Sequence, residues 1–403
     1  MKHMNRAIDR ALQANRVAAR VANNAFDRMF RPGALIRSNQ TPFEEIGASG
    51  PMRVRYYPPL AESSIPLSDG QQMPVAPIEH AVPIVIVPPL AATSLIFDLM
   101  PERSLVRYLR ACGYRVYLVD WGSPERRHTH FGIKHYAEEM LGHALGCVRA
   151  HANTRPVSLL GWCMGGLFAL IYAGLSHDRD IQNLITIASP IDYRQGGIAA
   201  RITRAMELPA YLIRKYTSFR VHNVDPAYLQ VPGWVNALAF KLTNPVGSLT
   251  AYWDLFARLA DREFLVSHTT TSHFLENMED YPGGIVQDFI VKVGVDNDLS
   301  RGRIEVGDRV SQFDRIECSL LVFAGEADAI VTPQSAQTIL NLVQSPDKEF
   351  VIAPGGHAGV VMGNKAQSAV WAVLAQWLET RSGSQQAGVT TAETTAAPST
   401  ATT

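Results

Sequence analysis

The stretch that decides the fold is Leu159-Leu160-Gly161-Trp162-Cys163-Met164-Gly165-Gly166. It ends an apolar run typical of a buried strand, and residues 164–177 continue with a helical pattern. Glycines two positions before and after the cysteine leave room for a sharp turn from strand to helix, in which the central residue takes strained backbone angles. We therefore predict a nucleophile elbow with Cys163 at its apex.

The predicted elbow would make Cys163 a good nucleophile. The positive end of the helix dipole favours a thiolate at the helix N-terminus. The backbone N–H of Met164 would point toward the oxygen that becomes charged when the thiolate attacks a carbonyl. A buried structural cysteine is the alternative interpretation, and the paired glycines in this strand-to-helix setting argue against it.

A cysteine nucleophile needs a base, and the base needs an acid to orient it. Downstream, Asp328 follows the apolar run 319–324, and His357 follows the run 349–352. This gives the order nucleophile, acid, histidine, with each residue just after a predicted strand. Asp192 is an alternative acid because it follows another predicted strand, and Glu326 lies in the same loop as Asp328.

Short apolar runs alternate with helical patterns on both sides of the elbow, which is typical of a mostly parallel sheet covered by helices on both faces. We expect strands at residues 53–57, 82–87, 114–120, 157–162, 184–188, 319–324 and 349–352. We expect helices at residues 102–111, 134–151, 164–177, 334–343 and 367–380.

The alternation stops between residues 196 and 312, where proline, aromatic residues and irregular helical segments are frequent and no strand is evident. We interpret this part as a cap inserted into an α/β core. The predicted units are an N-terminal helix and linker, two parts of the core separated by the cap, and a disordered tail. Their ranges are 1–48, 49–195, 196–312, 313–381 and 382–403.

Composition excludes several classes of protein. The 403 residues include 37 basic and 37 acidic side chains and are 47% hydrophobic. The hydrophobic content is typical of a globular protein, and the chain lacks the net positive charge whose electrostatic field would bind nucleic acid. Four widely spaced cysteines and the absence of a metal or nucleotide motif predict no disulfide, metal or cofactor. A reducing cytoplasm is the simplest location.

Charge is unevenly distributed along the chain. Residues 1–32 contain seven basic and two acidic side chains, so the remainder carries a net charge of −5. Apolar residues recur near helical spacing in the same segment, which predicts a basic amphipathic helix. A granule surface, an anionic membrane or a partner helix could each bind it.

Six motifs resemble the polyhydroxyalkanoate synthases, particularly the shorter class III and IV catalytic subunits, and the likeness runs from about Arg53 to Arg381. The motifs are Val87-Pro88-Pro89-Leu90, Phe97-Asp98-Leu99, Tyr117-Leu118-Val119-Asp120-Trp121-Gly122, the cysteine box, Asp328-Ala329-Ile330-Val331, and Pro354-Gly355-Gly356-His357 with Lys365-Ala366-Gln367. The resemblance implies an α/β-hydrolase fold.

The resemblance also implies a reaction. Cys163 would accept a 3-hydroxyacyl group from coenzyme A as a thioester, and His357, supported by Asp328, would deprotonate first Cys163 and then the hydroxyl that extends the polyester. Backbone amides of Met164 and of Leu90 or Ala91 would hold the oxyanion. A small partner subunit or a homodimer is implied as well.

Two other functions stay open at this point. The first is a thioester or ester hydrolase that uses the same triad, with water in place of the hydroxyl acceptor. The second is a noncatalytic protein bound to a granule or membrane through its N-terminal helix. Departures from the family pattern bear on substrate recognition, because Ala329 stands where the synthases have histidine and Thr271-Ser272-His273-Phe274-Leu275 stands where they have a tryptophan.

Overall fold

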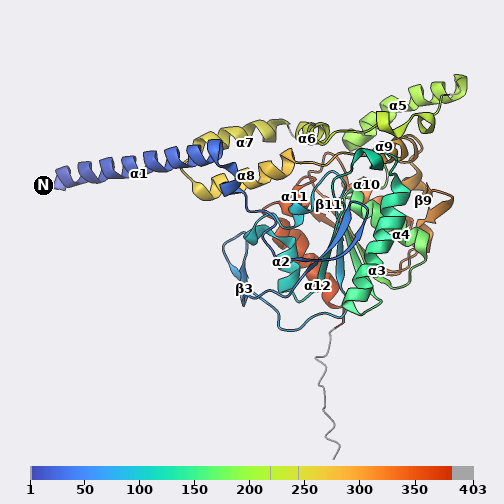
Figure 1. Cartoon of the computed structure of the whole chain (residues 1–403), viewed down its shortest axis with the longest axis horizontal. Coiled ribbons are helices and arrows are strands. Elements are labelled where there is room, and N and C mark those ends of the chain that lie inside the picture. The colour runs from blue at the N-terminus through green and yellow to red at the C-terminus, as the bar shows by residue number, and fades with distance from the viewer. Residues whose placement is uncertain (1, 218, 244, 384–403) are drawn as a thin grey trace, which may run out of the picture.

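The centre of the protein is an eight-stranded sheet in the order β1-β2-β6-β5-β7-β8-β11-β12 (Figure 1). The computed structural model describes residues 2–217, 219–243 and 245–383. Pairs from β6 to β12 are parallel, and the pairs β1/β2 and β2/β6 are antiparallel. The strands are β1 (Glu44–Ser49), β2 (Met52–Tyr57), β5 (Ile84–Val87), β6 (Val116–Asp120), β7 (Val157–Trp162), β8 (Ile181–Ile187), β11 (Ser319–Gly325) and β12 (Lys348–Ala353).

Helices cover both faces of this sheet, and strand side chains alternate between the two resulting cores. In β5, for example, Val85 and Val87 belong to one core, and Ile84 and Ile86 belong to the other. The first core includes α3 (Leu141–Ala152), α4 (Met164–Ser176) and α10 (Pro333–Gln337). The second includes α2 (Leu105–Ala111), α11 (Gly359–Met362) and α12 (Ala372–Glu379). This arrangement confirms the predicted α/β-hydrolase fold class.

All seven predicted strands are present, and β8 begins three residues earlier than predicted. The edge strand β1 was not predicted, because its side chains are largely exposed and no apolar run marks it. The sequence also gave no sign of a small hairpin of β3 (Ser64–Pro66) and β4 (Gln72–Pro74). Strands of three residues are too short to create a recognisable alternating pattern.

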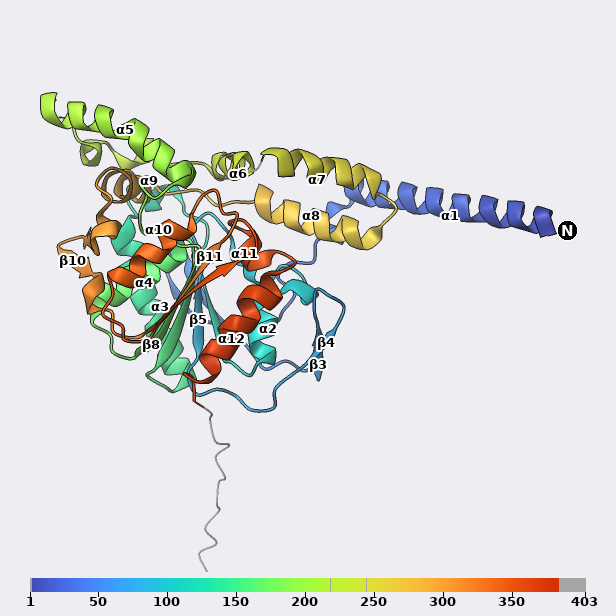
Figure 2. The same cartoon turned by 180° about the vertical axis from the view of Figure 1, so that it is seen from behind.

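Between β8 and β11 the chain forms helices that lie over one end of the core in both views (Figures 1 and 2). They are α5 (Gly197–Tyr216), α6 (Gly233–Leu242), α7 (Pro245–Ala257), α8 (Arg262–Glu276) and α9 (Gly283–Asp288). We call this group the cap helices. Since β8 and β11 are parallel neighbours, the segment both leaves and rejoins one sheet.

The prediction that residues 196–312 contain no strand is wrong. A hairpin of β9 (Arg303–Val306) and β10 (Arg309–Gln312) follows the cap helices, and Ser311 Oγ donates a hydrogen bond of 2.8 Å to the carbonyl of Ile171 in α4. The hairpin therefore packs against the core. Each strand has only four residues, too few for its alternation of exposed and buried positions to stand out in the sequence.

The predicted N-terminal helix is present as α1 (Lys2–Phe30), which extends away from the core in both views (Figures 1 and 2). Its C-terminal end is fixed to the cap helices: Asn24 Nδ2 donates to the carbonyl of Leu259 at 2.8 Å, and Arg262 pairs with Asp27 at 2.6 Å. Among the helices of the described residues, none is both long and apolar enough to cross a membrane. Residues 384–403 of the predicted tail lie outside the described residues.

Candidate active site

Cys163 lies at the apex of a tight turn between β7 and α4, with φ of 52° and ψ of −120°. Its amide donates a 2.8 Å hydrogen bond to the carbonyl of Ile187 in the neighbouring strand, which holds these rarely adopted angles. A Cβ atom on Gly165 would lie 2.0 Å from the carbonyl oxygen of Val87, and one on Gly161 would lie 2.4 Å from the Cα of Gly166. Only glycine fits at these two positions, so the elbow has the predicted geometry.

His357 and Asp328 meet beside this elbow. The strands β7, β8, β11 and β12 are parallel neighbours in this order, and their carboxyl ends are in register. The loops that follow these strands therefore lie at the same edge of the sheet. His357 Nδ1 lies 2.8 Å from Asp328 Oδ2, and the Asp328 side chain is fully buried. Asp328 Oδ1 accepts the amides of Ile330 and Val331 at 2.8 and 2.9 Å, which fixes the carboxylate in place.

The Cys163 side chain lies on the same side of the group, close enough to the His357 ring to affect its charge. Burial opposes a charge on the ring, but Cys163 and Asp328 outweigh it and raise the pKa of His357 to about 10. A carboxylate only accepts hydrogen bonds, so Nδ1 carries the proton in the pair with Asp328. Nε2 is then the nitrogen left for Cys163, and proton exchange between the two stays a prediction.

The two alternative acids have other contacts. Asp192 Oδ1 accepts a 2.8 Å hydrogen bond from Asn297 Nδ2 and a 2.9 Å hydrogen bond from the amide of Arg194. Glu326 is exposed on the surface. In this geometry Asp328 is the carboxylate that orients His357.

The predicted oxyanion residues lie at the same edge. Because the start of α4 approaches Val87 and Pro88 closely at Gly165, the elbow and the loop that continues to Leu90 and Ala91 are in contact. Leu90 and Met164 are buried at 5% and 9% exposure. The roles of Met164, Leu90 and Ala91 as amide donors stay a prediction.

Three aromatic residues near the triad were missed by the sequence reasoning. Tyr193 and Tyr281 are close enough to Cys163 to feel its charge, and burial together with that charge raises the pKa of both phenols well above the ordinary value. Phe240 of α6 has its ring 6.4 Å from that of His357. Tyr193 follows β8, which is the neighbour of β7 in the sheet, so the predicted order of the strands could have indicated this residue. Phe240 and Tyr281 belong to the segment between β8 and β11, and they come near Cys163 and His357 through long-range packing that no local sequence pattern reveals.

The other cysteines differ from Cys163 in their surroundings. Burial raises the pKa of Cys112 and Cys318 to about 12, so these thiols stay protonated at neutral pH. The sulfur of Cys147 lies 3.5 Å from His143 Nε2 on α3, away from the edge that carries the triad. All four cysteines are free thiols.

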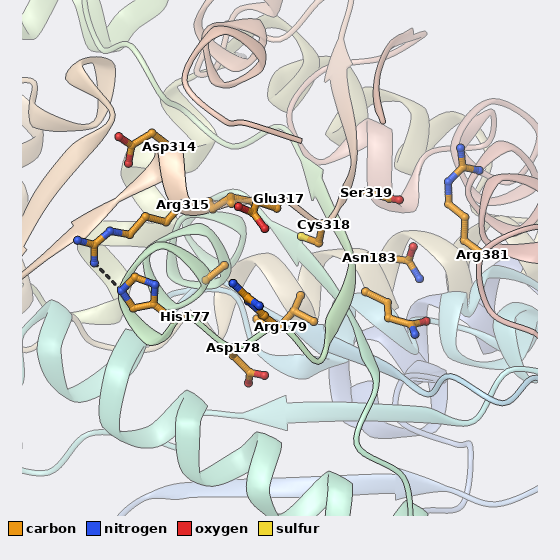
Figure 3. Close-up of a pocket in the computed structure, with 14 residues that line it drawn as sticks. His177, Asp178, Arg179, Asn183, Asp314, Arg315, Glu317, Cys318, Ser319 and Arg381 are labelled. Atoms are coloured by element: carbon orange, nitrogen blue, oxygen red, sulfur yellow. Dashed lines mark hydrogen bonds between the residues drawn. The ribbon is translucent and has the colours of Figure 1, made fainter. Parts of the chain in front are cut away.

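A cavity of about 760 Å³ opens at the opposite edge of the sheet (Figure 3). It is lined by the first residues of β11 and by the end of α4, where Arg315 donates a 2.6 Å hydrogen bond to His177 Nε2. Cys163 follows the carboxyl end of β7, so the length of the sheet separates it from this cavity. Within the described ranges, no three histidine, cysteine or acidic side chains gather as metal ligands would.

The fold agrees with the family that the sequence matches. The sequence model of a hydrolase family described as serine aminopeptidase S33 matches residues 102–358, which include Cys163, Asp328 and His357. The chain belongs to this α/β-hydrolase family.

Similarity to individual proteins within the α/β hydrolases is more specific than the family match. The chain is 28% identical over 306 residues to the poly(3-hydroxyalkanoate) polymerase subunit PhaC of Haloferax mediterranei, covering 75% of this chain and 60% of that protein. It is 27% identical to the subunit of the same name from Allochromatium vinosum, covering 76% and 83% respectively. These relatives confirm the resemblance to the polyhydroxyalkanoate synthases.

Among solved structures, DcsB in complex with its substrate analogue aligns with a TM-score of 0.50 and 14% identity, covering 85% of this chain and 99% of that one. Similarity at this level of identity concerns the fold alone. The chain spans less than two thirds of the length of the Haloferax relative.

Proposed function

We propose that the protein is an acyltransferase that takes 3-hydroxyacyl groups from coenzyme A thioesters and joins them into a polyester. The observation that carries this proposal is a cysteine, paired with His357 and Asp328, at the apex of the elbow. The similarity to proteins named poly(3-hydroxyalkanoate) polymerase supports the substrate class. No cofactor or metal takes part in the proposed reaction, and free thiols are in keeping with a cytoplasmic location.

The first half of the reaction loads the enzyme. His357 Nε2 removes the Cys163 proton, and the thiolate attacks the carbonyl carbon of the substrate thioester. The amide of Met164, with that of Leu90 or Ala91, stabilises the oxyanion of the tetrahedral intermediate. When the bond between this carbon and the coenzyme A sulfur breaks, the leaving sulfur takes the proton from His357, and the acyl group remains on Cys163.

The second half extends the polyester. His357 removes the proton of a hydroxyl group from another 3-hydroxyacyl unit, and the oxygen attacks the carbonyl carbon of the acyl-cysteine. An ester bond forms, the bond to Sγ breaks, and His357 returns the proton to Cys163. Exchange between two thioesters is nearly isoenergetic, and the stored thioester remains reactive toward a hydroxyl, which explains the use of cysteine.

A hydrolase is the second candidate because the chain belongs to a hydrolase family. The same acyl-cysteine would then be released by water. The outcome depends on whether the cap admits water to the acyl-cysteine or only the hydroxyl of a second acyl unit. The apolar ring of Phe240 lies beside that of His357, with 6.4 Å between the ring centroids, and an apolar neighbour of the base supports transfer over hydrolysis.

The experiment uses the full chain and 3-hydroxybutyryl-coenzyme A, with and without a candidate partner subunit. Release of free coenzyme A thiol and formation of insoluble polymer are followed together. Cys163→Ala should abolish both, and Cys147→Ala, which removes a thiol elsewhere on the protein, should preserve both. Thiol release without polymer would identify a hydrolase, and equal turnover by Cys163→Ala would contradict the proposed nucleophile.

A further inference from the structure

One side of the protein exposes an unusual number of apolar side chains. Among the described residues, all exposed large hydrophobic side chains except Ile78, Val310 and Ile352 lie within residues 12–30 or 202–256. These residues belong to α1, to the cap helices α5, α6 and α7, and to the segment between α5 and α6. The helices α1, α7, α6 and α5 follow one another along the same side of the protein in both views (Figures 1 and 2). We call this surface the apolar cap face.

Aromatic rings dominate the exposed part of this face. Trp253 and Phe256 of α7 are 75% and 76% exposed, and Trp234 of α6 is 69% exposed. Met29 and Phe30 at the end of α1 are 71% and 65% exposed. Exposed apolar side chains gathered on neighbouring helices mark an interaction site, because exposing them to water carries a free-energy cost.

The same helices carry an excess of positive charge. Together α1 and α5 contain ten basic and three acidic residues, in a chain whose net charge is zero. The exposed side chains of Arg10, Arg16 and Arg20 have no carboxylate partner within the described part of the chain. On α5, Arg201 and Arg204 are likewise exposed and without an acidic partner there.

We infer that the apolar cap face binds an anionic phospholipid surface. A helix with exposed apolar residues on one side and arginines on the other lies in the plane of a lipid interface, with apolar side chains among the acyl chains and guanidinium groups at the phosphates. A second copy of the chain fits this face less well, because it would bring two sets of unpaired arginines together.

The position of this face matters for the reaction, and this step rests on the proposed function. Helix α6 has Trp234 exposed on the apolar cap face, and its Phe240 contacts the His357 ring. The same short helix therefore contributes both to the apolar cap face and to the surroundings of His357, so a lipid surface bound there would lie near the site of the proposed reaction.

The binding test needs no activity, so its result is independent of the proposed reaction. The full chain is mixed with vesicles of phosphatidylcholine alone or of equal parts phosphatidylcholine and phosphatidylglycerol, and bound protein is measured by flotation. We expect binding to the anionic vesicles at least about tenfold tighter than to the neutral ones, weakening as salt is raised. The double variant Trp253→Ser with Phe256→Ser should lower the affinity for anionic vesicles by at least about tenfold.

Ile78→Ser is the matched control, because Ile78 is exposed to a similar extent, 61%, outside the apolar cap face. It should leave vesicle binding unchanged. Equal affinity for both kinds of vesicle, or full binding by the double variant, would overturn the inference. So would light scattering that shows a dimer of the wild type that the double variant no longer forms, because the face would then be covered by a second copy.

Discussion

Replacing Asp328 by asparagine tests the triad most directly, because every hydrogen bond of that carboxylate is defined. Oδ2 accepts from His357 Nδ1, and Oδ1 accepts from the amides of Ile330 and Val331. An asparagine has only one oxygen. If it serves the two amides, its NH₂ group faces His357 Nδ1, and the ring must place its proton on Nε2, where it can no longer accept the Cys163 proton.

The expected magnitude follows from this geometry. Loss of the working tautomer should lower the rate by about 10³- to 10⁴-fold, which corresponds to about 4 to 5.5 kcal/mol of transition-state stabilisation. The side chain of Asp328 is fully buried, so one mismatched hydrogen bond should also lower the free energy of unfolding by about 1–3 kcal/mol.

Two assays measure these effects. Alkylation of Cys163 by iodoacetamide, followed by mass spectrometry, reports the basicity of His357 without any substrate, and thiol release from 3-hydroxybutyryl-coenzyme A reports turnover. Asp192→Asn is the matched control, since its carboxylate contacts Asn297 and not His357. Full alkylation and turnover in Asp328→Asn, or their loss in Asp192→Asn, would refute the assignment of the acid.

Three further predictions concern the same edge of the sheet. Cys163→Ala should lower the pKa of His357 from about 10, because it removes the interaction that does most to raise that pKa. Burial, which favours the neutral ring, is then opposed by Asp328 alone. NMR titration of the ring measures the midpoint, and an unchanged value would contradict the prediction. Gly165→Ala should lower the free energy of unfolding by about 2 kcal/mol or more in denaturant titrations, because its Cβ would lie 2.0 Å from a backbone oxygen. Gly146→Ala in α3 is the matched control for Gly165→Ala. An added Cβ there would have no atom within 4 Å, so the substitution should be neutral or stabilising by up to about 1 kcal/mol. Phe240→Ala should raise the fraction of acyl groups released as free acid instead of polymer, and an unchanged product ratio would show that this ring does not exclude water.

Much of the core could be predicted because short stretches of sequence are enough to mark its strands and the elbow. The parallel strands are buried on both faces, so they appear in the sequence as continuous apolar runs. The elbow was predictable from Gly161 and Gly165, since the turn brings backbone atoms to within a distance that only glycine permits. Asp328 and His357 were found because strand ends of a parallel sheet share an edge.

The cap residues near the triad could not be predicted in this way. Phe240 reaches His357 through the placement of α6, which depends on contacts between segments far apart in the chain. Tyr281 is positioned by a pair of backbone hydrogen bonds with Val231, 50 residues earlier, and Val231 has no sequence feature that indicates this partner. The hairpin of β9 and β10 was missed for a different reason, since each of its strands has only four residues, too few for a recognisable alternation.

The connection of the cap to the core has an evolutionary consequence. The cap helices form one continuous excursion of the chain between the neighbouring strands β8 and β11, whereas Cys163, Asp328 and His357 follow strands of the sheet itself. Under the proposed function, substitutions, insertions or exchange of this single segment can therefore change which acceptor reaches the acyl-cysteine without disturbing the residues that form it. Under that proposal, remodelling one insertion is enough to move a lineage between polymer synthesis and hydrolysis, with the elbow, the acid and the histidine left in place.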